Sequence, residues 1–232
     1  MTSRQLHSTV FGPCGFEDQT LVEISGPPKS GRSLVLQQLI AHCVAPYAFG
    51  GRQWSIYLIN LSHKITRESL TKVVRAELQA FSLEGKPPAA EELTEIAKEC
   101  VARVSFMKCF TTADVKYTLF NIPYETLRDR SVELIAIDTL SEFYWLDAAE
   151  RKQNLTKYRY YRQCQMHLNR ICKEALVCGM YTVDSSFLNS KYNEKIAGAK
   201  VDYNIQMSKL RGNLAMNRKS VSFSNGIIEI RQ

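Results

Sequence analysis

One eight-residue stretch decides the fold expected of this chain: Gly26-Pro27-Pro28-Lys29-Ser30-Gly31-Arg32-Ser33. A short apolar run at residues 21–25 precedes it, and a helical pattern with one apolar face follows it. Strand, glycine-bracketed loop and helix are the context of a phosphate-binding loop, because the glycines let backbone N–H groups point inward and the helix N-terminus adds its positive dipole end. We therefore predict that residues 26–33, hereafter the phosphate loop, bind a nucleotide.

The phosphate loop departs from the usual pattern G-x-x-x-x-G-K-[ST] at one position. Arg32 stands where the pattern has the lysine that reaches the β- and γ-phosphates. A guanidinium keeps the positive charge, but it is planar and larger than an ammonium group, so the replacement is not conservative. We expect Arg32 to permit binding at best and to misplace the γ-phosphate.

A second apolar run, residues 132–138, ends in Asp138. Strand ends often carry an acid, but an acid that follows a phosphate loop in this order is typical of a nucleotide site. Asp138 would hold Mg²⁺ through its water shell beside the hydroxyl of Ser33, so these two residues form the predicted metal site. Given Arg32, ATP and Mg²⁺ are expected to bind weakly or to be dispensable.

The rest of the chain alternates between apolar runs and helical patterns, which indicates a mostly parallel sheet flanked by helices. Strands are expected at residues 54–60, 104–110 and 177–183, and a long helix at about 153–175. From residue 201 the apolar side chains alternate with polar ones, and Asn225-Gly226 is a two-residue hairpin signal. We predict an α/β fold with antiparallel strands at its C-terminal edge. Residues 1–20 are interpreted as a short N-terminal extension and 21–232 as one domain.

The composition is that of an ordinary globular protein with a formal net charge of +7. The charge is compatible with a nucleic-acid partner but does not establish one. The sequence has neither an apolar run long enough to span a membrane nor an N-terminal signal-peptide pattern. The seven scattered cysteines form no C-x-x-C pair, and buried thiols are expected rather than disulfides or zinc ligands.

The run Leu-Ile-Ala-Ile-Asp-Thr-Leu-Ser-Glu-Phe-Tyr-Trp-Leu-Asp at residues 134–147 resembles the acid-strand segment of the eukaryotic RecA-type recombinase paralogues. The phosphate loop, the segment 103–138 and the final strands align with that family in the same order. The resemblance therefore covers roughly residues 20 to 230, the whole ATPase core. Like one branch of the family, the chain lacks the small N-terminal helical domain of the recombinases.

This resemblance implies a RecA-like core and a nuclear role in homologous-recombination repair of DNA double-strand breaks, in mitotic or meiotic cells. Its relatives act in hetero-oligomers of RecA-like paralogues that support a recombinase filament on single-stranded or branched DNA. The implied partners are thus other paralogues, the filament and DNA, with no membrane. In this family nucleotide lies between neighbouring cores, so even a degenerate site contributes one face of an interface.

The resemblance also shows which catalytic parts this chain lacks. Active relatives carry a water-activating glutamate after the strand that corresponds to residues 56–60, where this chain has Ser62 and His63. The strand that ends near Val183 usually leads to a glutamine that senses the γ-phosphate. Here it reads Thr182-Val183-Asp184, and Val183 is taken as the departure. Independent ATP hydrolysis is therefore not expected. His63 is a candidate replacement base, although a loop histidine is more often an ordinary surface residue.

The DNA-facing loops of the family correspond to roughly residues 148–154 and 185–200. They contain the basic residues Arg151, Lys152, Lys191, Lys195 and Lys200, which suit phosphate contacts and not sequence readout. The run Tyr158-Arg159-Tyr160-Tyr161-Arg162 also resembles a basic-aromatic surface for single strands. Since Tyr158 and Tyr161 lie on the apolar stripe of the predicted helix, core packing is the favoured interpretation of that run.

Two alternative functions fit parts of the sequence. The chain is an active DNA-dependent ATPase if Arg32 is tolerated and a catalytic acid comes from elsewhere. A small-molecule kinase with a phosphate loop is disfavoured, because such enzymes usually carry an arginine-rich lid where this chain ends in a strand-rich hairpin. Release of phosphate in the presence of single-stranded DNA separates the ATPase from a non-catalytic subunit.

Overall fold

The computed structural model describes residues 6–12, 17–82, 89–150, 155–190, 196–210, 213–224 and 226–230. Its elements run in the order α1 (Leu6–Phe11), β1 (Leu21–Gly26), α2 (Arg32–Val44), η1 (Tyr47–Phe49), β2 (Ser55–Asn60), α3 (Arg67–Ser82), α4 (Ala90–Ala102), β3 (Val104–Met107), α5 (Thr112–Arg128), β4 (Val132–Asp138), α6 (Tyr144–Glu150), α7 (Lys157–Ala175), β5 (Cys178–Asp184), η2 (Ser185–Phe187), β6 (Tyr203–Leu210), β7 (Asn213–Met216), β8 (Lys219–Ser224) and β9 (Ile227–Ile230).

Among the described residues, nine strands form one sheet in the order β3-β2-β4-β5-β1-β6-β7-β8-β9. The pairings from β3 to β6 are parallel, and those from β6 to β9 are antiparallel. β6 is the junction, because it pairs in parallel with β1 and antiparallel with β7. The predicted α/β class with an antiparallel C-terminal edge is confirmed, and the arrangement is consistent with a RecA-like core.

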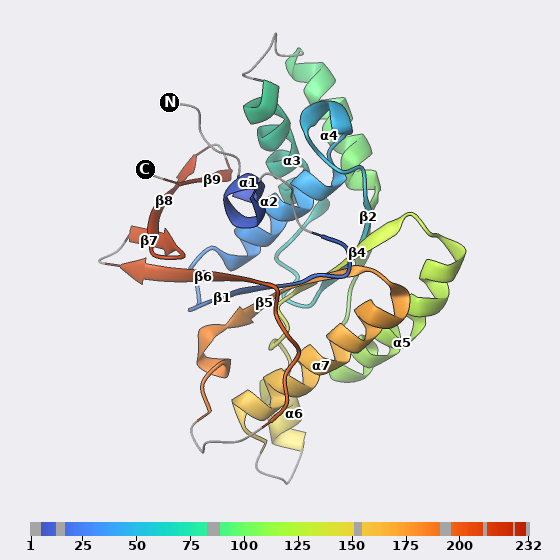
Figure 1. Cartoon of the computed structure of the whole chain (residues 1–232), viewed down its shortest axis with the longest axis vertical. Helices are drawn as coiled ribbons and strands as arrows, with labels where there is room; N and C mark the ends of the chain where they lie inside the picture. Colours follow the sequence, from blue (N-terminus) through green and yellow to red (C-terminus); the bar gives the residue numbers. More distant parts are fainter. Residues whose placement is uncertain are drawn as a thin grey trace.

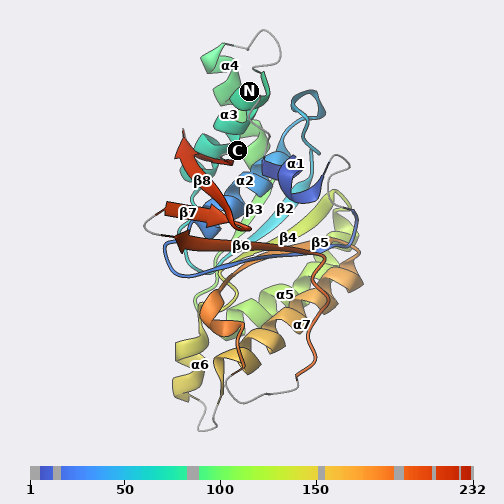
Figure 2. The ribbon, with the colours of Figure 1, turned by 60° about the vertical axis from the view of Figure 1, so that its left-hand side comes forward.

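Helices cover both faces of the parallel part of the sheet (Figures 1 and 2). α1, α2, α3 and α4 lie on one face, and α5 and α7 lie on the other. Each face has its own apolar core, since side chains that alternate along a central strand point to opposite sides. The N-terminal helix joins the first core through the buried Leu6 and Phe11, so residues 6–11 pack against the sheet domain. None of the described helices is long and apolar enough to cross a membrane.

Several element boundaries differ from those predicted. The long helix begins at Lys157, because Thr156 caps it by accepting a hydrogen bond from the Arg159 N–H at 3.1 Å. The third strand ends at Met107 and not near Phe110.

α5 continues as one helix through Pro123. Its start is held by a capping box in which Thr111 accepts from the Asp114 N–H and Asp114 accepts from the Thr111 N–H. The expectation of buried thiols is confirmed for Cys43, Cys100, Cys109, Cys172 and Cys178.

Candidate functional site

The sheet register brings the predicted site residues to one edge. Gly26, the last residue of β1, lies opposite Asp184, the last residue of β5. Asp138 ends β4, which lies directly beside β5. Ligands of open α/β sheets bind at the carboxyl ends of the strands, where β1, β4 and β5 end together here.

The phosphate loop has the backbone conformation that an anion-binding loop needs. Lys29 and Gly31 have positive φ angles of 59° and 89°, which turn the chain toward the start of α2. Glycine is required at 31 for a second reason, since a Cβ there would lie 2.7 Å from the Phe223 ring of β8. α2 begins at Arg32 without a side-chain cap, so its first N–H groups, which have no intrahelical acceptor, face the loop.

Asp138 is the centre of a buried group of hydroxyls. Ser33 Oγ lies 2.9 and 3.0 Å from its two carboxylate oxygens. Ser62 Oγ donates at 2.6 Å and Thr182 Oγ1 at 2.7 Å. The predicted pair Ser33 and Asp138 is thus in direct contact, and the structure adds Ser62 and Thr182, for which the sequence offered no signal.

Arg32 turns toward the end of β5. Its Nη2 lies 3.8 Å from Asp184 Oδ2, and the two side chains are only 13% and 18% exposed. Burial lowers the pKa of the Arg32 guanidinium, and the neighbouring carboxylates, first among them Asp184, act against that shift. Because the intrinsic pKa of arginine is so high, the group stays protonated. Nothing in the sequence indicated that Asp184 is the partner of Arg32.

Two hydrogen-bonding atoms of the phosphate loop are buried and have no protein partner. They are Ser30 Oγ and Arg32 Nη1. Buried polar atoms in folded proteins are almost always paired with protein groups, water or a ligand. The unpaired donors, the open helix N-terminus and the Ser33–Asp138 contact together fit the phosphates and metal ion of a nucleotide.

Ser62, His63 and Val183 stand at the positions where the resemblance leads us to expect catalytic groups in active relatives. Ser62, at the position expected for the catalytic glutamate, donates a hydrogen bond to Asp138. His63 is exposed and stacks on Phe110, with their ring centroids 4.8 Å apart. Val183 is fully buried in the core, so its side chain does not reach the site.

Four of the five residues predicted to contact DNA lie outside the part of the chain that the structure describes. Arg151, Lys152, Lys191 and Lys195 lie outside the described residues. The Lys200 side chain is 90% exposed, and its Nζ lies 3.3 Å from Asp202 Oδ1. An exposed lysine with one surface partner remains accessible to a phosphate.

The basic-aromatic run on α7 is largely part of the core. Tyr161 is buried as predicted, Tyr158 is only partly buried, and Tyr160, which was not placed on the predicted stripe, is buried as well. Arg162 donates to Tyr158 Oη at 3.0 Å and to Gln165 Oε1 at 2.9 Å. The prediction of core packing is therefore confirmed for Tyr161 and is only partly met at Tyr158.

A buried polar network beneath the run was not predicted. Glu23 of β1 accepts hydrogen bonds from the hydroxyls of Tyr161 and Tyr181, and Gln165 donates to both hydroxyls at 2.8 and 2.7 Å. Burial and the Glu23 carboxylate raise the pKa of both tyrosines, which keeps them protonated as donors. The network ties α7 and β5 to β1 just before the phosphate loop.

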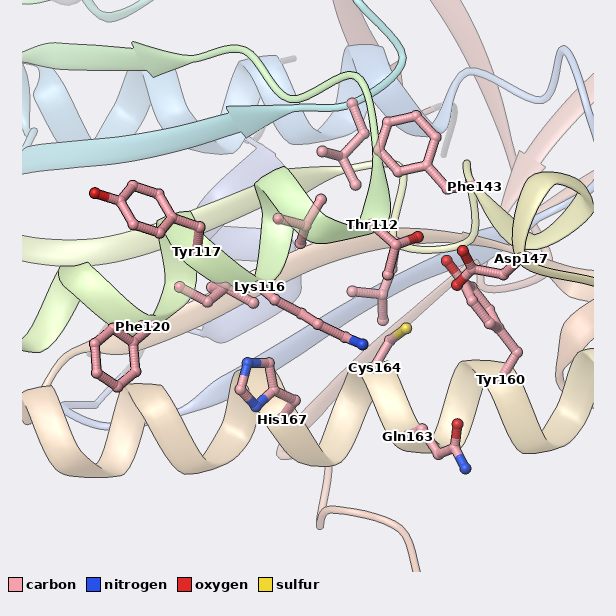
Figure 3. Close-up of a pocket in the computed structure, with 14 residues that line it drawn as sticks. Thr112, Lys116, Tyr117, Phe120, Phe143, Asp147, Tyr160, Gln163, Cys164 and His167 are labelled. Atoms are coloured by element: carbon pink, nitrogen blue, oxygen red, sulfur yellow. The ribbon is translucent and has the colours of Figure 1, made fainter. Parts of the chain in front are cut away.

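α5 presents an apolar stripe to the surface. Its members are spaced three, four and three residues apart and are more than half exposed: Tyr117 72%, Phe120 61%, Tyr124 57% and Leu127 71%. A cavity of about 460 Å³ adjoins the stripe between α5 and α7. Figure 3 shows Phe120 and Lys116 from α5 and Cys164 and His167 from α7 at this cavity. Exposed apolar surface of this extent is typical of interaction sites.

The aromatic run Phe143-Tyr144-Trp145 after the acid strand is mostly part of the core. Phe143 and Tyr144 are buried, and only Trp145, at 67% exposure, reaches the surface. Tyr144 packs edge-on against Tyr160 and Phe187 and donates to the Leu155 carbonyl at 2.9 Å. Core packing thus explains two of the three residues.

Comparison with known proteins relates this chain to a DNA repair protein. No protein-family model matches the chain. The chain is similar to the curated DNA repair protein XRCC2 of Mus musculus, with 24% identity over 155 residues, covering 66% of this chain and 52% of that protein. The chain therefore spans about half the length of this relative. The match confirms the predicted resemblance, which among the recombinase paralogues is to the X-ray repair cross-complementing paralogue of the second complementation group.

Proposed function

We propose that this chain is a recombinase-paralogue subunit that acts in the nucleus in homologous-recombination repair of DNA double-strand breaks. It uses a RecA-like core with a degenerate nucleotide site to assemble with other paralogues, and it supports a recombinase filament on single-stranded DNA. The observation that carries the proposal is the similarity to a DNA repair protein. The retained phosphate loop and the missing hydrolytic acid agree with it.

In this proposal the phosphate loop holds the phosphates of ATP, and Ser33 and Asp138 hold Mg²⁺. The metal ion, when bound, would screen the negative charge of the phosphates. Asp138 already accepts hydrogen bonds from the hydroxyls of Ser33, Ser62 and Thr182, which stabilise its carboxylate when no cation is bound. Nucleotide is therefore a weak or dispensable ligand of this subunit.

Assembly with a second RecA-like chain is assigned to the apolar stripe of α5. An apolar face at a spacing of three and four residues suits an extended or helical segment of a partner that places side chains along the same stripe. The four large side chains of the stripe are solvent-exposed in the isolated chain. Covering them would remove apolar area from water and so drive association.

Co-purification tests the proposal. Tagged protein expressed in its native cells is expected to recover stoichiometric RecA-like chains, identified by mass spectrometry. The double substitution Phe120→Asp, Tyr124→Asp is expected to lower that recovery by about tenfold or more, because charges replace apolar side chains at the centre of the stripe. Tyr47→Asp is the matched control, since Tyr47 is also an exposed aromatic residue, at 69%, but lies on η1 away from α5.

Two outcomes contradict the proposal. Recovery of the monomer alone, or of chains unrelated to recombinases, removes the paralogue assignment. If the control lowers recovery as much as the double substitution, the stripe of α5 is not the assembly surface.

A DNA-dependent ATPase is the second candidate, and the intact contact between Ser33 and Asp138 is the observation that favours it. The non-catalytic subunit predicts no phosphate release above background when purified protein is mixed with ATP and single-stranded DNA. Turnover that Asp138→Asn abolishes would identify the chain as the ATPase instead. Asp147→Asn, which replaces another buried carboxylate outside the phosphate loop, controls for damage to the fold.

A further inference from the structure

An acidic side chain, Asp184, lies beside the phosphate loop and faces Arg32. Asp184 ends β5 directly opposite Gly26, and its Oδ2 lies 3.8 Å from Arg32 Nη2. Both side chains are mostly buried. The cation that the loop would offer to a phosphate therefore already faces a carboxylate of the same chain.

Asp184 is fixed in this orientation by a second interaction. It is the N-cap of η2, where its Oδ1 accepts a hydrogen bond from the Ser186 N–H at 2.8 Å. An N-cap bond holds the side chain against the start of the helix. With Oδ1 held by the backbone, Oδ2 is the oxygen that faces Arg32.

We propose that Asp184 is a positioning residue that holds the Arg32 guanidinium and so sets the affinity of the phosphate loop for polyphosphate ligands. The inference rests on the proposed nucleotide-binding role of that loop. Arg32 and Asp184 neutralise each other, and a triphosphate has to displace the carboxylate to reach the guanidinium. The carboxylate also repels the incoming phosphates. Both effects are strengthened because the pair is largely screened from water.

The pair gives a physical reason for Arg32 and Asp184 to occur together in this chain. Arginine is long and forked, so it reaches the end of β5 while its other terminal nitrogen, Nη1, remains unpaired. An aspartate at 184 supplies the charge that a buried guanidinium requires. Arginine at 32 without an acid at 184 would leave a buried positive charge with less compensation and a stronger attraction for anions.

Nucleotide binding to the full chain tests this role. The probe is a fluorescent N-methylanthraniloyl ATP, and inorganic tripolyphosphate serves as the competitor that lacks a base. Asp184→Asn is expected to bind both ligands about tenfold more tightly than the parent, because it removes the competing charge. The asparagine Oδ1 still accepts from the Ser186 N–H, so the cap of η2 is kept. Asp184→Ser, another capping residue, carries the same expectation.

A double-mutant cycle with Arg32→Gln separates this role from a general change in charge. In the Arg32→Gln background Asp184→Asn is expected to change the affinity by less than about twofold, because the positioned group is gone. Glu142→Gln is the matched charge control: Glu142 is an exposed carboxylate that acts on Arg32 through its charge alone, and we expect a change of less than about threefold.

Two results overturn the inference. The first is that neither Asp184 variant binds the ATP analogue or tripolyphosphate more tightly than the parent does. Urea unfolding of both variants checks that they are as stable as the parent. The second is an equal gain in the Arg32→Gln background, since a simple loss of negative charge would explain it. Co-purification of partners tests the paralogue function, whereas nucleotide binding tests the positioning role of Asp184. Either proposal can therefore fail without the other.

Discussion

Gly51→Ala is expected to lower the free energy of unfolding by more than about 3 kcal/mol, enough to leave much of the protein insoluble. Gly51 joins α2 to β2. A Cβ at this position would lie 2.1 Å from the Ala45 carbonyl oxygen and 2.5 Å from the Ala45 Cβ. These are atoms of the backbone or next to it, and the Ala45 carbonyl also accepts from the Gln53 N–H at 3.0 Å. They have no freedom to move aside.

Urea unfolding followed by circular dichroism measures the loss, and Gly12→Ala provides the control. Gly12 has a positive φ of 76° but no atom within 4 Å of an added Cβ. Its substitution should cost only the conformational strain of about 1 to 2 kcal/mol. Equal losses in the two variants would show that crowding against Ala45 is not what requires glycine at 51.

Glu77→Gln is expected to stabilise the protein at pH 8 by up to about 3 kcal/mol, from the difference between the folded and unfolded pKa of this group. Glu77 is a buried residue of α3. Burial raises the pKa of its carboxyl from 4.5 to about 7, and the hydrogen bond from Gln38 acts against that shift. Glutamine keeps an oxygen acceptor for Gln38 without the cost of burying a charge.

The pH dependence follows from the direction of this shift. Between pH 4.5 and about 7 the folded state holds a proton on Glu77 that the unfolded state has lost, so stability falls as the pH rises through this window. The stabilisation by glutamine should therefore be full at pH 8 and close to zero at pH 4.5. Unfolding curves at both values check this, and Glu92→Gln, at an exposed position of α4, should show no such trend. A gain that is the same at both pH values would contradict it.

Local sequence patterns were sufficient for the parts of the site that lie within one segment. The glycines of the phosphate loop, the apolar run before it and the helix after it are consecutive, so their order alone predicts the loop conformation. Asp138 was predicted because an acid at the end of an apolar strand has a fixed place in a parallel sheet. The structure places both where they were expected, and Ser33 touches Asp138.

Contacts between distant segments could not be predicted in the same way. Ser62, Thr182 and Asp184 meet the phosphate loop or Asp138 only because β2, β4, β5 and β1 are neighbours in the sheet. The alternation of side chains along one strand shows which face each of them takes, but not which strands are its neighbours in the sheet. For the same reason the sequence did not indicate that Asp184 is the partner of Arg32, although the fold brings the two side chains together.

The fold class, the phosphate loop and its departure at Arg32 could be predicted from the order of residues, because each depends on the conformational preferences of neighbouring residues. The orientation of Arg32, the burial of the tyrosines of α7 and the uncovered face of α5 could be seen only in the folded chain. These depend on packing and on the electrostatic field of residues more than a hundred positions away. In this protein the loop is a local feature, and its neutralisation by Asp184 is a property of the whole fold.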